Sequence, residues 1–138
     1  MLLPLQRRGS AARLPSRPTE GSLYVVEASE GAILGPGQVA KIPTGLAFEV
    51  PSRHHLFLRE TSSLALRGLQ IVGGVLGSDF TGRLYVHLRN NGRESHVVRA
   101  GDGVAKLELG HDLLAGFETL PTIDELFGPP DKCRTTTT

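Results

Sequence analysis

The sequence has no tryptophan and a single cysteine, Cys133, among 138 residues. One cysteine excludes a disulfide within the chain and a zinc site built from several cysteines, so we expect Cys133 to be a free thiol. No apolar run reaches the roughly 18 residues that a membrane-spanning helix needs, and we expect no membrane partner. The opening stretch 1–5 is short and contains a proline, which argues against a signal peptide. These absences predict an intracellular protein of the cytoplasm or nucleus.

The chain also lacks a strong excess of charge of one sign. Its 15 Lys and Arg residues against 14 Asp and Glu residues leave a formal net charge of +1. A nearly neutral chain has no overall field that attracts polyanions, so we expect no nucleic-acid partner. The beginning is uneven, because basic residues gather there: Arg7, Arg8, Arg13 and Arg17. We predict a flexible basic segment over residues 1–21.

Short apolar segments separated by Gly and Pro occupy residues 22–112, which we expect to form one domain. Strand-length runs at this spacing are typical of an all-β barrel or sandwich. Alternation is clear at Leu84, Val86 and Leu88, and again at Ala105, Leu107 and Leu109. We predict strands over 23–26, 39–42, 46–50, 56–58, 69–72, 83–89, 95–99 and 104–109, with a short one near 2–5. Residues 113–138 are predicted to be a C-terminal arm or tail.

One segment departs from β structure. Ser62 or Thr61 can cap a single helical turn over 63–67, which Gly68 would end. A free helix N-terminus also attracts anions. Ser62 can therefore be a helix cap whether or not it also binds a phosphate.

Asn91 and Gly92 form a strong two-residue hairpin signal. A two-residue turn there would place His87 opposite His96 on adjacent strands. Two imidazoles without a third ligand make a weak metal site. We predict no metal site in the protein.

The run 72–82 is rich in glycine, which allows tight turns and close approach of the backbone to other groups. Asp79 and Phe80 lie in this run, and we expect an exposed loop with Phe80 as a wall for a flat ligand. The alternative is a glycine-rich hairpin without a ligand. Asp79 and Asp102 can also be turn residues that bond their own backbone.

Four blocks occur in order within about residues 20–110. They read Ile42-Pro-Thr-Gly-Leu-Ala-Phe-Glu-Val-Pro51, Thr61-Ser-Ser-Leu-Ala65, Gly74-Val-Leu-Gly-Ser-Asp-Phe-Thr-Gly82 and Ala100-Gly-Asp-Gly-Val-Ala-Lys-Leu107. In order and spacing they resemble the blocks of trimeric dUTP pyrophosphatases (dUTPases). The resemblance implies a jelly-roll β-barrel and a homotrimer whose subunits share active sites. It also implies Mg²⁺-assisted attack of water on dUTP, which gives dUMP and pyrophosphate.

The resemblance assigns a set of residues to nucleotide binding. Phe80 stands where a tyrosine stacks on deoxyribose, and Lys106 stands where glutamine is common. The nucleotide-binding set is Ser62, Ser63, Gly74, Val75, Asp79 and Phe80, with phosphate contacts at Ser62 and Lys106.

Several positions depart from the family pattern. Gly77 occupies the place of the aspartate that orients and deprotonates the attacking water. Thr61 replaces an arginine, and a hydroxyl cannot reproduce bidentate, charge-assisted bonds to phosphate. The first block, over 20–25, lacks its aspartate, and residues 128–134 lack the glycines of a phosphate-closing tail. A related dCTP deaminase would need a glutamate where His87 stands.

We therefore expect a diverged dUTPase, of viral or virus-derived origin, whose hydrolysis is weak or lost. It would retain binding of a deoxyuridine nucleotide, or of a host or partner protein. One alternative is an active Mg²⁺-dependent pyrophosphatase in which Asp79 is the base. Another is a non-enzymatic trimeric scaffold.

Overall fold

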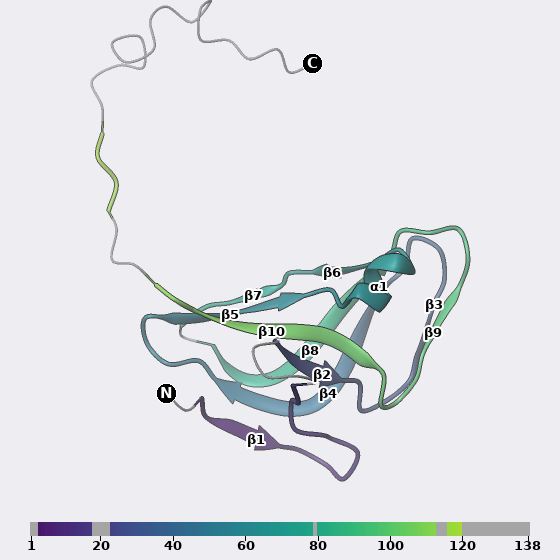
Figure 1. Cartoon of the computed structure of the whole chain (residues 1–138), viewed down its shortest axis with the longest axis horizontal. Coiled ribbons are helices and arrows are strands. Elements are labelled where there is room, and N and C mark those ends of the chain that lie inside the picture. Colours follow the sequence, from purple (N-terminus) through teal and green to yellow (C-terminus); the bar gives the residue numbers. More distant parts are fainter. Residues whose placement is uncertain (1–2, 18–22, 79, 113–115, 120–138) are drawn as a thin grey trace, which may run out of the picture.

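The computed structural model describes residues 3–17, 23–78, 80–112 and 116–119 (Figure 1). These residues form an all-β fold with one short helix, as the sequence predicted. The elements are β1 (Leu5–Arg7), β2 (Tyr24–Glu27), β3 (Ala32–Leu34), β4 (Val39–Glu49), β5 (His54–Arg59), α1 (Ser62–Leu66), β6 (Leu69–Val72), β7 (Val75–Leu76), β8 (Thr81–Asn90), β9 (His96–Val98) and β10 (Gly103–His111). Within these ranges, no helix has the length and apolar character needed to cross a membrane.

Two four-stranded sheets make up the jelly-roll barrel. One has the order β1-β4-β8-β6 and the other β2-β10-β5-β7, while β3 and β9 pair as a separate arm. All of these pairs are antiparallel. The arm projects beside α1 at one end of the barrel, where Arg67 Nη2 donates a 3.0 Å hydrogen bond to Val97 O (Figure 1).

The core follows from side-chain alternation along the strands. Leu84, Val86 and Leu88 of β8 are at most 1% exposed, as predicted for one face of that strand. Fully burying a side chain of this kind contributes about 1.5–3 kcal/mol. On β10 the alternation ends early, because Leu109 is 41% exposed at the barrel opening. Leu109 still shares the face of Leu107, as predicted, and both line one apolar opening, but burial along this face ends at Leu107.

Strand β4 joins two segments that were predicted to be separate strands. It runs from Val39 to Glu49, with a shift in register against β8 between Pro43 and Ala47. The irregularity tolerates the proline, which cannot donate to a strand ladder. Inside the bulge, the buried Thr44 hydroxyl donates to Leu84 O at 2.8 Å and accepts from Leu46 N at 3.2 Å.

The predicted hairpin at residues 91–92 is wrong. Strand β8 pairs with β4 and β6, whereas β9 pairs with β3. The reason is Asn90, whose buried amide donates to Leu34 O at 3.1 Å and to Glu94 O at 2.7 Å. Its carbonyl oxygen accepts from Gly92 N at 2.9 Å. These bonds turn the chain out of the sheet and into the arm.

The same topology separates His87 from His96, so the predicted cross-strand pair is also wrong. His87 lies opposite Lys41 on one side and Val72 on the other. His96 lies opposite Leu34 in the arm.

Residues 3–17 lie against the barrel, whereas the sequence predicted a flexible segment there. Strand β1 pairs with β4, slightly later in the chain than the strand predicted near 2–5. Ala12 is only 2% exposed, and it packs on Gly45. A Cβ on Gly45 would come within 2.5 Å of the Ala12 Cβ, and Gly45 has a φ of +70°. Glycine is therefore required where the N-terminal segment crosses β4.

Candidate functional site

Helix α1 presents two of the predicted phosphate ligands. Thr61 is the N-cap, and its hydroxyl accepts from Leu64 N at 3.2 Å. Leu64 is 2% exposed and anchors the turn in the core. The cap leaves the side chains of Ser62 and Ser63 exposed on the first turn. The helical turn is confirmed, and of the two capping alternatives the structure selects Thr61.

Gly73 and Gly74, which follow β6, form a tight connection that packs against β5. Leu58 N donates to Gly74 O at 2.7 Å, and a Cβ on Gly74 would lie 2.5 Å from Leu58 O. Only glycine fits at that distance. Val75, the next predicted site residue, is 60% exposed at the surface of β7.

Lys106 approaches the same region from the other side of β5. It lies on β10, half-buried and opposite Arg59. Because β5 lies between β10 and β7 in the sheet, Lys106 and Gly74 flank its C-terminal end. The chain then enters α1 at Ser62 within three residues of Arg59. The structure therefore brings Ser62, Gly74 and Lys106 to one end of β5.

Phe80 lies toward the opposite end of that strand. Its N–H donates to Gly77 O at 3.0 Å, and its carbonyl accepts from Val50 N at 3.0 Å, next to the turn that leads into His54. The stretch of β5 from His54 to Leu58 is roughly 13 Å long at the usual strand rise. The ring is half-buried and packs on the core, so the expectation of a ring on an exposed loop is corrected.

Three further predictions concern single residues. Asp102 is a turn residue as expected, since its carboxylate accepts from Arg99 N at 2.9 Å and its N–H donates to Arg99 O at 3.0 Å. Gly77 is exposed in the turn that precedes Phe80. Asp79 and Cys133 lie outside the described residues.

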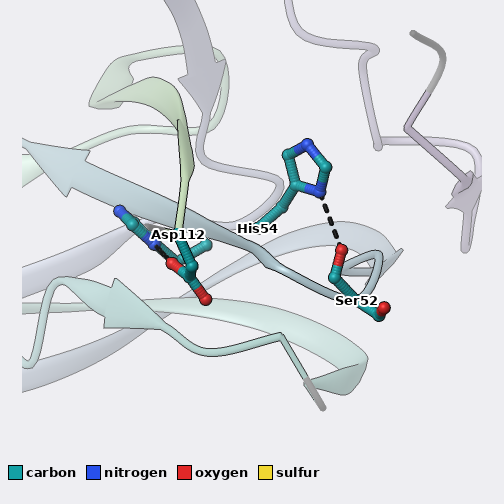
Figure 2. A network of polar contacts seen from close by, with 4 residues as sticks. Ser52, His54 and Asp112 are labelled. Atoms are coloured by element: carbon teal, nitrogen blue, oxygen red, sulfur yellow. Dashed lines mark hydrogen bonds and ion pairs between the residues drawn. The ribbon is translucent and has the colours of Figure 1, made fainter. Parts of the chain in front are cut away.

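A histidine cluster that the sequence did not reveal ties the end of β10 to β5. His54 and His111 lie opposite each other, with ring centroids 4.8 Å apart. His54 Nδ1 lies 2.9 Å from Ser52 O, and Figure 2 shows the His54 imidazole directed at Ser52. His55 Nδ1 contacts the Asp112 carboxylate. Only the register of the two strands could have indicated this cluster. Across the described ranges, no group of three or more His, Cys, Asp or Glu side chains could hold a metal ion.

An apolar opening of about 380 Å³ lies between the N-terminal segment and the second sheet. Its walls include Leu3, Leu14, Tyr24, Phe48, Leu56 and Leu109, and none of its lining residues carries a charge. An uncharged lining does not suit a triphosphate. The opening is therefore distinct from the predicted nucleotide-binding residues.

Comparisons with known proteins agree with this fold. The dUTPase family model matches residues 11–126. The deoxyuridine 5'-triphosphate nucleotidohydrolase of Anaeromyxobacter sp. is 36% identical over 108 residues, which cover 75% of this chain and 74% of the relative. That of Desulfitobacterium hafniense is 35% identical over 126 residues, covering 86% and 83%.

Solved structures give the same result for the fold. The dUTPase of Staphylococcus bacteriophage 80alpha has a TM-score of 0.79 at 17% identity, over 88% of this chain and 97% of that one. The dUTPase of phage phi11 of S. aureus has a TM-score of 0.79 at 18% identity, over 90% and 99%. Together with the family model and the relatives above 30% identity, these matches establish that the chain belongs to the dUTPase family.

Proposed function

We propose that this chain binds a deoxyuridine nucleotide and hydrolyses it slowly or not at all. The observation that carries the proposal is Gly77, which is exposed in the turn where the family pattern has its water-activating aspartate. A positioned general base contributes about 10²–10⁴ in rate, and glycine has no side chain to supply it. The relatives named for dUTP support dUTP as the nucleotide.

Thr61 is a second reason for weak hydrolysis. It stands where the family pattern has a phosphate-binding arginine, and its hydroxyl accepts from Leu64 N in the helix cap. A hydroxyl engaged in a cap carries no positive charge to stabilise the charge that develops on the phosphates. Glu60 precedes it and adds a negative charge near the same turn.

The residues left for binding are divided between the two ends of β5. Ser62, Ser63 and Lys106 would contact phosphates, and Phe80 would lie against the deoxyribose. A single nucleotide would have to span the whole strand to reach both sets in one chain. This division supports a homotrimer in which the phosphate residues of one copy face the Phe80 of another.

A metal ion would enter with the nucleotide. The phi11 dUTPase is described with a structural Mg(II) ion, but the residues described for this chain contain no cluster that could hold one. Mg²⁺ is commonly bound through substrate phosphates with few protein ligands. We therefore assign Mg²⁺ to the triphosphate, and only if the chain is active.

The test combines turnover with binding. We expect pyrophosphate release from dUTP and Mg²⁺ well below 1 s⁻¹, which is the low end of ordinary enzyme rates. Calorimetry with the non-hydrolysable analogue dUpNHpp should still detect binding, and Ser62→Ala should weaken it. Turnover on the order of 1–10 s⁻¹ sinks the proposal.

The relatives' names favour a second candidate, an active dUTP pyrophosphatase. Asp79 is then the nearest acid on the loop that could replace the missing base. Asp79→Asn should abolish turnover, with Asp102→Asn as a control because Asp102 bonds its own turn. An unchanged rate in the Asp79 variant rejects this candidate. If dUpNHpp does not bind at all, the trimeric scaffold for a host or partner protein is the function to pursue.

A further inference from the structure

The outer face of the β1-β4-β8-β6 sheet carries a line of cationic side chains. Strand β8 alternates strictly, so that Leu84, Val86 and Leu88 point into the core while their neighbours point outward. The outward residues are Arg83, Tyr85, His87 and Arg89. All are exposed except Tyr85, which is half-buried.

The neighbouring strands extend this face without adding a carboxylate. Lys41 and Val72 lie opposite His87, and Val39 and Gln70 lie opposite Arg89. Directly opposite residues share one side of a sheet. Glu49, at the far end of β4, lies opposite Thr81 and outside this stretch. The paired strands therefore present only cationic and uncharged side chains between Arg83 and Arg89, and the exposed Glu30 of the β2–β3 loop lies beside the Arg83–Tyr85 end of this face.

Within the part of the chain that the structure describes, no ion pair involves a cation of this face. Among the described residues, the ion pairs involve Arg13, His55 and Arg59, all outside this face. Lys41 Nζ instead lies 4.1 Å from the centroid of the Tyr85 ring. This contact holds the lysine over the sheet while keeping its charge. The overall charge of +1 conceals the patch because acids elsewhere balance it.

We infer that this face binds the phosphate backbone of single-stranded nucleic acid. Side chains two residues apart on a strand are about 7 Å apart, so Arg83 and Arg89 span about 20 Å. This spacing is close to that of successive phosphates in an extended strand. A sheet face has no helix or ribbon that could enter the major groove of a duplex, whereas cationic surfaces with an aromatic residue suit single strands. The inference does not depend on hydrolysis or on the deoxyuridine site.

Fluorescence anisotropy of the full chain with a labelled oligodeoxyadenylate tests the inference. Adenine is chosen because it does not resemble uracil, and excess dUpNHpp should not displace it. Each phosphate contact on a single strand contributes about −0.7 to the slope of log K against log salt. Contacts from Lys41, Arg83 and Arg89 predict a slope of about −2. No binding at about 50 mM salt overturns the inference.

The double variant Arg83→Gln/Arg89→Gln should reduce the slope by about 1.4 and weaken binding roughly tenfold or more. The matched control Arg13→Gln/Arg99→Gln removes the same charge outside the sheet and should bind like the wild type. Equal losses in both variants overturn the inference. So does polyglutamate that competes as well as the oligonucleotide, which indicates an acidic protein partner. A changed oligomeric state of the β8 variant by light scattering also overturns it, because the face is then an interface between copies.

Discussion

The two ends of strand β5 differ in what holds them. At the Leu58 end, Gly74 packs so closely on β5 that a Cβ would lie 2.5 Å from Leu58 O, and the buried Leu64 anchors α1 in the core. At the other end, Gly77 lies in an exposed turn closed by its bond from Phe80 N. Packing therefore requires particular residues at the first end and leaves the second free to change. If Gly77 replaces a catalytic aspartate, as we propose, the barrel tolerates that loss because packing does not depend on the second end.

The largest expected effect is on stability at the Leu58 end. Leu64→Ala should reduce the free energy of unfolding by about 2–5 kcal/mol, because it leaves a cavity beneath α1. Leu66→Ala on the same helix is the control, since Leu66 is 89% exposed and its loss should change stability by less than about 0.5 kcal/mol. Urea denaturation measures both. Equal effects in the two variants would show that α1 does not anchor this end.

The next largest expected effect is on turnover, and it concerns Gly77 in the exposed turn at the Phe80 end of β5. Gly77→Asp should raise the rate of pyrophosphate release about 100-fold, equal to about 2.7 kcal/mol of barrier. We choose the lower limit for a general base because Thr61 still lacks the charge of an arginine. Gly77→Asn is the isosteric control and should not gain activity. If the aspartate variant stays at the wild-type rate, the missing base is not what limits hydrolysis.

The third prediction compares the stability cost of a close contact at Gly74 with that of backbone strain at Gly73. Gly74→Ala should cost about 1–3 kcal/mol, because its Cβ meets Leu58 O and forces β7 away from β5. Gly73→Ala has open space but a φ of +69°, so it should cost about 1–2 kcal/mol without moving β7. Hydrogen exchange at the Leu58 amide distinguishes them. It should accelerate in the Gly74 variant only, and the same acceleration in both would contradict the contact.

Most of the fold could be predicted from the sequence because the signals were local. Apolar alternation located β8, and capping residues located α1 to within one residue. The arm could not be predicted, because its partner strands are distant in the sequence and Asn90 acts through bonds to Leu34 and Glu94. The hairpin signal at Asn91 was outweighed by this buried amide. The packing of Ala12 on Gly45 is likewise a contact between distant segments, which turn chemistry alone does not reveal.

The sequence proposed residues for the candidate site but not their arrangement in space. The family blocks suggested Ser62, Gly74 and Lys106, and the structure places these three residues at one end of β5. Their separation from Phe80 depends on the direction of β5 and β7, which no short motif records. The burial of the Phe80 ring was missed because a polar, glycine-rich loop predicts exposure, whereas the core reaches that turn.

The smallest effect distinguishes a cap from a ligand within one helical turn. Thr61→Ala should cost about 1 kcal/mol of stability, because Leu64 N loses its acceptor. Ser62→Ala removes an exposed hydroxyl and should cost less than about 0.5 kcal/mol. Affinity for dUpNHpp should show the opposite order, with the greater loss in the Ser62 variant. Thermal unfolding and calorimetry on the same samples measure both. If Ser62→Ala alters neither quantity, the first turn of α1 serves only to hold the barrel, and the nucleotide's phosphates must be bound elsewhere.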